Sequence, residues 1–164
     1  MEDNNELVQE LQNLREQINS LQLATINLQQ LPEVSYAPCI WQDNACYLFL
    51  SDLAQHTHNL KQNPAISLMM IEDESRSRNM FARRRLVLQG TALKIERSDP
   101  LFKPVIAEFH HRFGEVMDLI EPLQDFNLFQ IKPESGRFIK GFGQAFELGG
   151  ENLDQLQHIN PARK

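Results

Sequence analysis

Hydrophobic residues recur at helical spacing near the start of the chain. Over residues 3–22, apolar side chains stand three or four positions apart: Leu7, Leu11, Leu14, Ile18 and Leu21. This spacing is typical of one face of an amphipathic helix. Two heptads are too few for a free coiled coil, so we expect this helix to lie on the domain or on a partner subunit.

Most of the remaining chain is predicted to form short strands. The runs 45–51 and 65–71 are apolar on both faces, which is typical of central strands. Further strands are expected at 23–28, 34–42, 84–96, 127–132 and 137–148, with helices at 52–63 and 100–112. A turn is predicted at Glu134-Ser135-Gly136. Hairpin-connected strands at this spacing predict a mostly β (α+β) fold, an antiparallel β-barrel with peripheral helices.

The chain divides into three predicted segments. These are an amphipathic helix at 1–22, a barrel domain at 23–148 and a polar tail at 149–164. A length of 164 residues fits one domain, and the hydrophobic content of 41% is enough for a core.

Charge and composition exclude several classes of function. The net charge of −6 gives no basic footprint for nucleic acid. No apolar run approaches the ~20 residues that span a membrane. The acidic, polar start is unlike a secretory signal, so a cytoplasmic protein is expected. Cys39 and Cys46 could face each other, but two buried thiols are the favoured interpretation, and zinc-type spacing is absent.

Charged residues are concentrated in the stretch 71–86, which holds three acids and five arginines. Strand alternation puts Arg84 on the side of the apolar positions that follow it, and Arg83 on the other side. An arginine on the core-facing side needs a partner, because an unpaired buried charge is costly. That partner is either a nearby acid, Glu72, Asp73 or Glu74, or the carboxylate or phosphate of a ligand.

The strand predicted at 137–148 carries a second candidate site. Lys140 stands in a row of phenylalanines, where it is either an anion contact or a stem that reaches solvent. Gly141 and Gly143 indicate a bulge or the close approach of a backbone or flat ligand. A barrel core with a tight corner explains the same residues without any ligand.

The sequence offers no side-chain nucleophile with its usual context. Neither a nucleophile elbow nor a phosphate-binding loop is present. Any chemistry is therefore expected to come from a cofactor. Five scattered histidines are each typical of a surface position, although His158 stands in a tail that could fold over a cofactor.

Several ordered motifs carry a family resemblance. They are Ser35-Tyr36-Ala37-Pro38, the stretches 51–60, 63–64, 70–74, 81–83 and 112–115, Leu123-Gln124-Asp125-Phe126, and the stretch 140–145. Together they resemble the HutZ/HugZ haem-utilisation family of the pyridoxamine-phosphate-oxidase-like superfamily. The resemblance covers roughly residues 20–148.

The resemblance implies a split β-barrel, a homodimer and a ligand site at the subunit interface. Flavin-binding relatives hold FMN there, whereas the HutZ/HugZ branch binds haem and opens it oxidatively. The family's iron ligand is a histidine of a Gly-His pair in the tail, supported by an aspartate of the partner subunit. Asp125 matches that aspartate and is the candidate catalytic residue. The tail lacks the Gly-His pair, so His158 is the candidate metal ligand.

The remaining candidate cofactor-binding residues are Arg83, Arg84, Lys140, Ser51, His56 and Thr57. Three functions stay open. The first is a haem-binding, haem-degrading protein, the second an FMN-binding oxidoreductase, and the third a non-catalytic haem carrier or storage protein. His56 stands where flavin relatives have a lysine, which favours haem.

Overall fold

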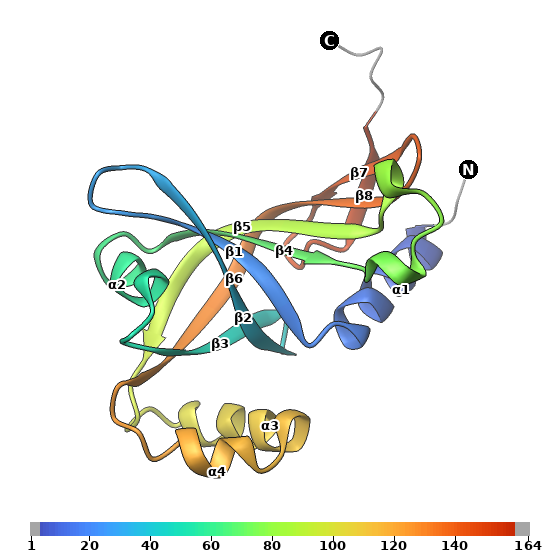
Figure 1. Ribbon diagram of the computed structural model, residues 1–164. Helices are drawn as coiled ribbons and strands as arrows, with labels where there is room; N and C mark the ends of the chain where they lie inside the picture. The colour runs from blue at the N-terminus through green and yellow to red at the C-terminus, as the bar shows by residue number, and fades with distance from the viewer. Residues whose placement is uncertain (1–3, 160–164) are drawn as a thin grey trace.

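Eight strands form one antiparallel sheet over residues 4–159, the part of the chain that the computed structural model describes (Figure 1). The strand order is β3-β2-β1-β4-β5-β6-β7-β8, and an additional pairing of β3 with β6 closes the first six into a barrel. The strands are β1 (Ser20–Ile26), β2 (Pro32–Gln42), β3 (Ala45–Ser51), β4 (Ala65–Ile71), β5 (Arg85–Ile95), β6 (Phe126–Gly141), β7 (Gln144–Gly149) and β8 (Gln155–His158). The predicted barrel is confirmed.

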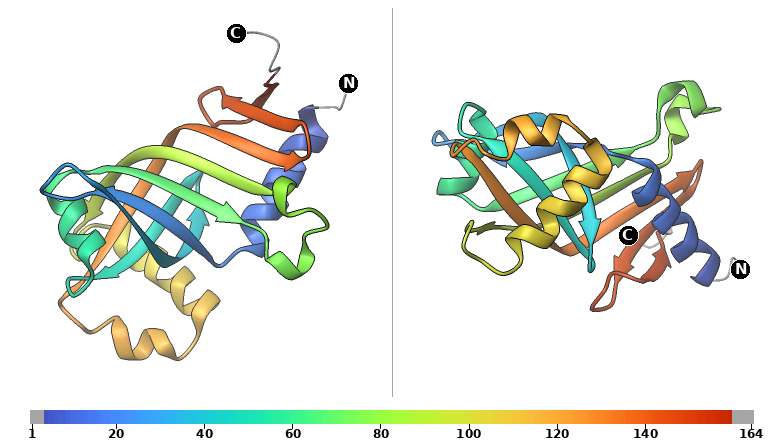
Figure 2. Two further views of the ribbon diagram at one scale, coloured as in Figure 1. Left: turned by 45° about the horizontal axis from the view of Figure 1, so that its top comes forward. Right: turned by 90° about the horizontal axis from the view of Figure 1, so that it is seen from below.

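Four α-helices of the described chain lie outside the barrel. They are α1 (Asn4–Gln17), α2 (Gln55–Gln62), α3 (Phe102–Phe113) and α4 (Val116–Ile120). Two 3₁₀ turns, η1 (Glu74–Arg76) and η2 (Met80–Ala82), connect β4 to β5. Figure 2 shows α1 next to the β7–β8 hairpin and the α3–α4 pair at the far end of the molecule. None of the described helices is long and apolar enough to cross a membrane.

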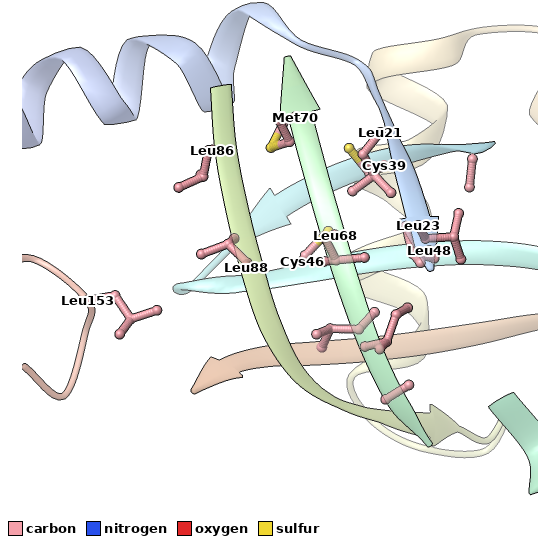
Figure 3. Packing of buried hydrophobic residues seen from close by; sticks show 14 of the residues in the cluster. Leu21, Leu23, Cys39, Cys46, Leu48, Leu68, Met70, Leu86, Leu88 and Leu153 are labelled. Atoms are coloured by element: carbon pink, nitrogen blue, oxygen red, sulfur yellow. The ribbon is translucent and has the colours of Figure 1, made fainter. Parts of the chain in front are cut away.

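The core has two parts, and β3 separates them. Leu48 points into the barrel interior, where it packs with Leu23, Leu68 and Leu88 (Figure 3). Phe49 points the other way and packs against Phe109 of α3. Every residue of β3 before Ser51 is buried. The prediction from the apolar run 45–51 is confirmed, since both faces of β3 are covered by other parts of the protein.

The N-terminal helix ends earlier than its hydrophobic spacing predicts. It stops at Gln17, and β1 begins at Ser20 instead of residue 23. Leu21 and Leu23 are buried as alternate residues of a strand, so the period changes from helical to two at this point. The leucines of α1 join the same core as the barrel strands. Cys39 and Cys46 are free, buried thiols, as expected.

The turn predicted at residues 134–136 is wrong. β6 runs through it without interruption, and its register with β5 shifts by one residue between Gln89 and Gly90, opposite Ser135 and Pro133. The chain reverses later, at Phe142-Gly143, where Gly143 has a φ of 70°. The tail, expected to be only polar, contributes β8 to the sheet, and its exposed edge position explains its polar sequence.

Gly136 is a strand glycine because its neighbours leave no room for a side chain. A Cβ atom there would lie 2.6 Å from Leu88 Cδ2 and 2.8 Å from Leu148 Cδ1. We expect Gly136→Ala to lower the free energy of unfolding by about 1–3 kcal/mol, the usual cost of overpacking. Urea denaturation measures this change. Ser135→Ala, at the exposed neighbouring position, is the control, and an equal effect of both variants would contradict the packing explanation.

Candidate functional site

The candidate site residues fall into two clusters at opposite ends of β6. At one end, Ser51 of β3 pairs with Phe126, and at the other, Arg85 of β5 pairs with Ile139. Thirteen residues separate these positions on β6, which corresponds to roughly 40 Å of strand. The first group, here the Asp125 cluster, contains Ser51, His56, Thr57 and Asp125. The second group, here the basic cluster, contains Arg76, Arg78, Arg84 and Lys140.

Asp125 is fixed by the end of β3. Its Oδ2 accepts a hydrogen bond of 2.9 Å from Ser51 Oγ, and its carbonyl accepts one of 2.8 Å from the Asp52 N–H. Thr57 Oγ1 in turn donates to the Ser51 carbonyl at 2.6 Å. Asp125 Oδ1 makes no hydrogen bond with any residue from 4 to 159. One carboxylate oxygen is therefore oriented and the other is available to a ligand or a partner.

Asn127 and Asp52 support this arrangement, and sequence reasoning missed both. Asn127 is buried, and its Nδ2 donates to Asp52 Oδ1 at 2.8 Å and to the Asp125 carbonyl at 3.0 Å. Asp52 also pairs with Lys61 at 2.5 Å. The hydrogen bond from Lys61 lowers the pKa of Asp52, so this carboxylate is charged at neutral pH. A polar Asn127 inside an apolar strand was the available signal.

His56 belongs to α2, directly after β3. Its Nδ1 lies 2.9 Å from Ser35 Oγ, a contact that fixes the ring against β2. The side chain is half-buried, and burial lowers the pKa of His56. The imidazole is therefore neutral at neutral pH. Thr57 is fully buried and serves the backbone of β3, so it supports the cluster from within.

The basic cluster surrounds a cavity of about 540 Å³ between the β4–β5 connection and the β6–β7 turn. Its lining consists of Glu72, Arg76, Ser77, Arg78, Asn79, Ala82, Arg84, Lys140, Gly141 and Phe142. Phe142 is 82% exposed, a large value for an aromatic side chain. The cavity thus combines four cationic side chains with an uncovered aromatic ring. Arg76, Arg78 and Phe142 were not among the predicted site residues, although the arginine-rich stretch contains the first two.

Arg84 lies at the cavity and not in the core. Its Nε donates to Glu72 Oε2 at 3.0 Å, so Glu72 is the partner among the three acids considered. Burial acts to raise the pKa of Glu72, but the hydrogen bonds and charge of Arg84 lower it on balance. The Arg84 side chain is 35% exposed, against 19% for Arg83, which pairs with Glu74. The expected alternation does not apply because β5 begins only at Arg85.

Lys140 reaches back to the N-terminal helix. Its Nζ lies 2.7 Å from Glu10 Oε1, so the ammonium both lines the cavity and ties α1 to β6. The predicted row of phenylalanines is real in part, since Phe138 and Phe146 face each other across β6 and β7 in the core. Phe142 leaves this row because it stands in the turn.

His158 lies on β8 beside the β6–β7 turn. Its Nε2 is 3.0 Å from the Gly143 carbonyl, and its ring meets Phe146 edge-on at 5.3 Å. A carbonyl only accepts, so Nε2 is the donor of this contact and Nδ1 is the ring nitrogen left for another partner. The structure therefore brings His158 near the basic cluster and leaves it remote from Asp125 of the same chain. Among residues 4–159, no three His, Cys, Asp or Glu side chains gather into a metal site.

Comparison with known proteins identifies the family of this chain. The family model described as pyridoxamine 5'-phosphate oxidase matches residues 7–140. Heme oxygenase HutZ of Vibrio cholerae serotype O1 is 41% identical over 155 residues, which are 94% of this chain and 88% of HutZ.

Two solved structures agree with this match. The crystal structure of HutZ, named a heme storage protein from Vibrio cholerae, has a TM-score of 0.74 and 42% identity, covering 77% of this chain and 89% of that one. Campylobacter jejuni ChuZ has a TM-score of 0.89 and 32% identity, covering 98% of this chain and 67% of that one. The chain therefore belongs to the pyridoxamine 5'-phosphate oxidase family and, within it, to the HutZ group.

Proposed function

We propose that this protein binds haem and degrades it, at a site shared by two subunits. The observation that carries the proposal is the cavity of the basic cluster, where four cations and the exposed Phe142 lie next to His158. The relative named as a heme oxygenase supports the same chemistry. Two reduced, unpaired cysteines fit a cytoplasmic location for this activity.

The lining of this cavity fits the two parts of a haem molecule. Haem has a flat apolar macrocycle and two carboxylates. Phe142 offers an apolar face to the macrocycle, and the arginines offer charge-assisted hydrogen bonds to the carboxylates. A volume of about 540 Å³ lies within the range of ligand pockets, roughly 300–1,000 Å³. Arg76 and Arg78 make no ion pair with a described residue, although the charge of Arg76 helps to lower the pKa of the nearby Asp73, so both guanidinium groups can contact a ligand anion.

His158 and Asp125 take complementary roles in this proposal. Bound haem supplies the redox chemistry through its iron. His158 is the residue that would hold the iron, through Nδ1. Its Nε2–H donates to the Gly143 carbonyl within the chain, and a carboxylate that accepts this N–H in place of the carbonyl would raise the basicity of the ligand. Asp125 has one carboxylate oxygen free for that hydrogen bond. Ser51 keeps the other oxygen in place.

Two subunits are needed to bring these residues together. About 40 Å of β6 separates the clusters in one chain, so a ligand at the basic cluster does not reach Asp125 of the same subunit. Exposed apolar side chains beside the Asp125 cluster fit burial against a second copy. Val34 and Tyr36 flank the serine that holds His56, and Leu53, 93% exposed, follows Asp52. The proposal is therefore a split-barrel homodimer.

FMN remains the second candidate, because a phosphate binds the same arginine and lysine donors. The family to which the chain belongs is described as pyridoxamine 5'-phosphate oxidase, and the superfamily has flavin-binding members that hold FMN, so FMN binding should be tested directly. A non-catalytic haem carrier is the third candidate, and HutZ has also been named a storage protein. Binding spectra separate flavin from haem, and turnover separates an enzyme from a carrier.

Haemin titration tests the proposed iron ligand. We expect the Soret band of haemin to shift when the wild-type protein is added. The absorption spectrum of FMN should stay that of the free flavin in the presence of the protein. In His158→Ala the Soret band should move and haemin affinity should fall, since the imidazole that would hold the iron is lost. His111→Ala, an exposed histidine of α3, is the matched control. Superimposable spectra of the His158 and His111 variants would remove His158 from the site, and no Soret shift in the wild type would remove haem.

Light scattering tests the shared site. The wild-type protein should have about twice the chain mass of 19.0 kDa. We expect the double variant Val34→Asp and Tyr36→Asp to become monomeric and to lose haemin affinity, because buried unpaired charges disfavour an interface. Leu119→Asp on α4, another exposed apolar position, should leave both unchanged. A monomer that binds haemin normally would contradict the model.

Asp125→Asn separates binding from turnover. The amide keeps the shape of the carboxylate but not its charge, so we expect haemin affinity close to that of the wild type. Degradation with ascorbate should slow by about 10–100-fold, as for other groups that support a metal ligand. The decay of the Soret band measures the rate. Asp154→Asn, an exposed acid, is the control. Full activity of Asp125→Asn would exclude the proposed role.

A further inference from the structure

Arg97 donates hydrogen bonds to the backbone of the segment that contains Asp125. It follows β5, and its guanidinium reaches across to the connection between α4 and β6. Nη1 donates to the Glu121 carbonyl at 2.9 Å, and Nη2 donates to the Leu123 carbonyl at 2.7 Å and the Phe126 carbonyl at 3.4 Å. We propose that Arg97 is a positioning residue for Asp125. The inference rests on the function proposed above and names a further residue for it.

The contacts of Arg97 depend more on the planar arrangement of its N–H donors than on its charge. All three acceptors are backbone carbonyls, and Arg97 forms no ion pair with a described residue. A planar guanidinium holds several donors in a fixed fork, whereas a lysine ammonium is a compact charge on a flexible stem. The Arg97 Cζ also lies 5.2 Å from the ring centroid of Phe102, which restrains the plane from one side. Lysine therefore does not replace this residue.

The clamped segment is held on both sides of Asp125. On the α4 side, Glu121 has its carbonyl bound to Arg97 and its carboxylate 2.5 Å from His110 Nε2. On the barrel side, Ser51 and the Asp52 N–H hold the side chain and carbonyl of Asp125. Arg97 thus fixes the position of the backbone at 121–126, and Ser51 sets the direction of the carboxylate.

Because Arg97 holds the backbone and Ser51 holds the carboxylate, the effect of losing Arg97 can be predicted. The barrel-side bonds to Asp125 survive, so the protein should fold and keep the basic cluster intact. The backbone of 121–126 gains freedom, and the free oxygen of Asp125 no longer stays at one place. A displacement of about 0.5 Å is enough to impair a functional group. The effect should fall on turnover, which needs Asp125, and not on haemin binding, which depends on the distant basic cluster.

The test compares Arg97→Ala and Arg97→Lys with Arg112→Ala in the full-length chain. Arg112 donates to a single carbonyl, that of Glu16, at 2.9 Å, and is the matched control. Both Arg97 variants should degrade haem with ascorbate about tenfold more slowly than the wild type. Haemin affinity and Tm should stay close to the control values. Arg97→Ala combined with Asp125→Asn should be no slower than Asp125→Asn, because Arg97 acts through Asp125.

Three results would overturn the proposal. A wild-type rate in Arg97→Lys would show that charge alone suffices. Additive losses in the double variant would show that Arg97 acts independently of Asp125. A parallel fall of Tm, affinity and rate in both Arg97 variants would reduce Arg97 to a structural residue.

Failure of the proposed function remains distinguishable from failure of this inference. If the wild type binds no haemin, the degradation rate cannot be measured. Hydrogen exchange of the Asp52 amide, which donates to the Asp125 carbonyl, is then measured instead. Exchange that is faster in Arg97→Ala than in Arg112→Ala supports the clamp. Equal exchange in the two variants overturns it.

Discussion

The pairing of β3 with β6 is the constraint on which the rest of this structure depends. It closes the barrel, and it buries β3 on both faces between the barrel interior and α3. The same pairing brings Ser51 beside the start of β6, so the hydroxyl of Ser51 meets the carboxylate of Asp125. Without it, the Asp125 cluster would consist of residues from two unconnected loops.

β6 also decides how far apart the two clusters lie. It pairs with β3 at one end, with β7 at the other and with β5 along its length. A single rigid strand therefore carries Asp125 at its start and Lys140 near its end. This spacing fits the proposal of a ligand site completed by a second subunit, because the two clusters lie at opposite ends of the strand.

Charges in the basic cluster are compensated unevenly. Arg84 and Lys140 each have an acidic partner, Glu72 and Glu10, whereas Arg76 and Arg78 make no ion pair with a described residue. Each of these pairs has one largely buried member, so separating the acid from its cation costs more than it does in a fully exposed pair. A shared fold does not by itself specify a ligand, so the function has to be argued from the side chains of the site.

The sequence by itself determined the parts of the fold that depend on local pattern. The boundaries of β3 and β4 agree with the predicted runs 45–51 and 65–71, since a short apolar stretch between turn residues leaves few alternatives. The amphipathic face of α1 and the unusual arginine-rich stretch could also be recognised from the sequence. Glu72, the acid that pairs with Arg84, was one of three neighbouring acids considered, and the sequence did not choose among them.

Only the tertiary structure decided the features that depend on distant neighbours. Glu134-Ser135-Gly136 has the composition of a turn, but Leu88 and Leu148 pack where a side chain of Gly136 would stand, so the strand continues. The burial of Asn127 and the three carbonyls around Arg97 come from segments that meet only in the fold. Ser51 and Asp125 are 74 residues apart and Asn127 and Asp52 are 75 apart, and partners at such separations leave no periodic signal along the chain.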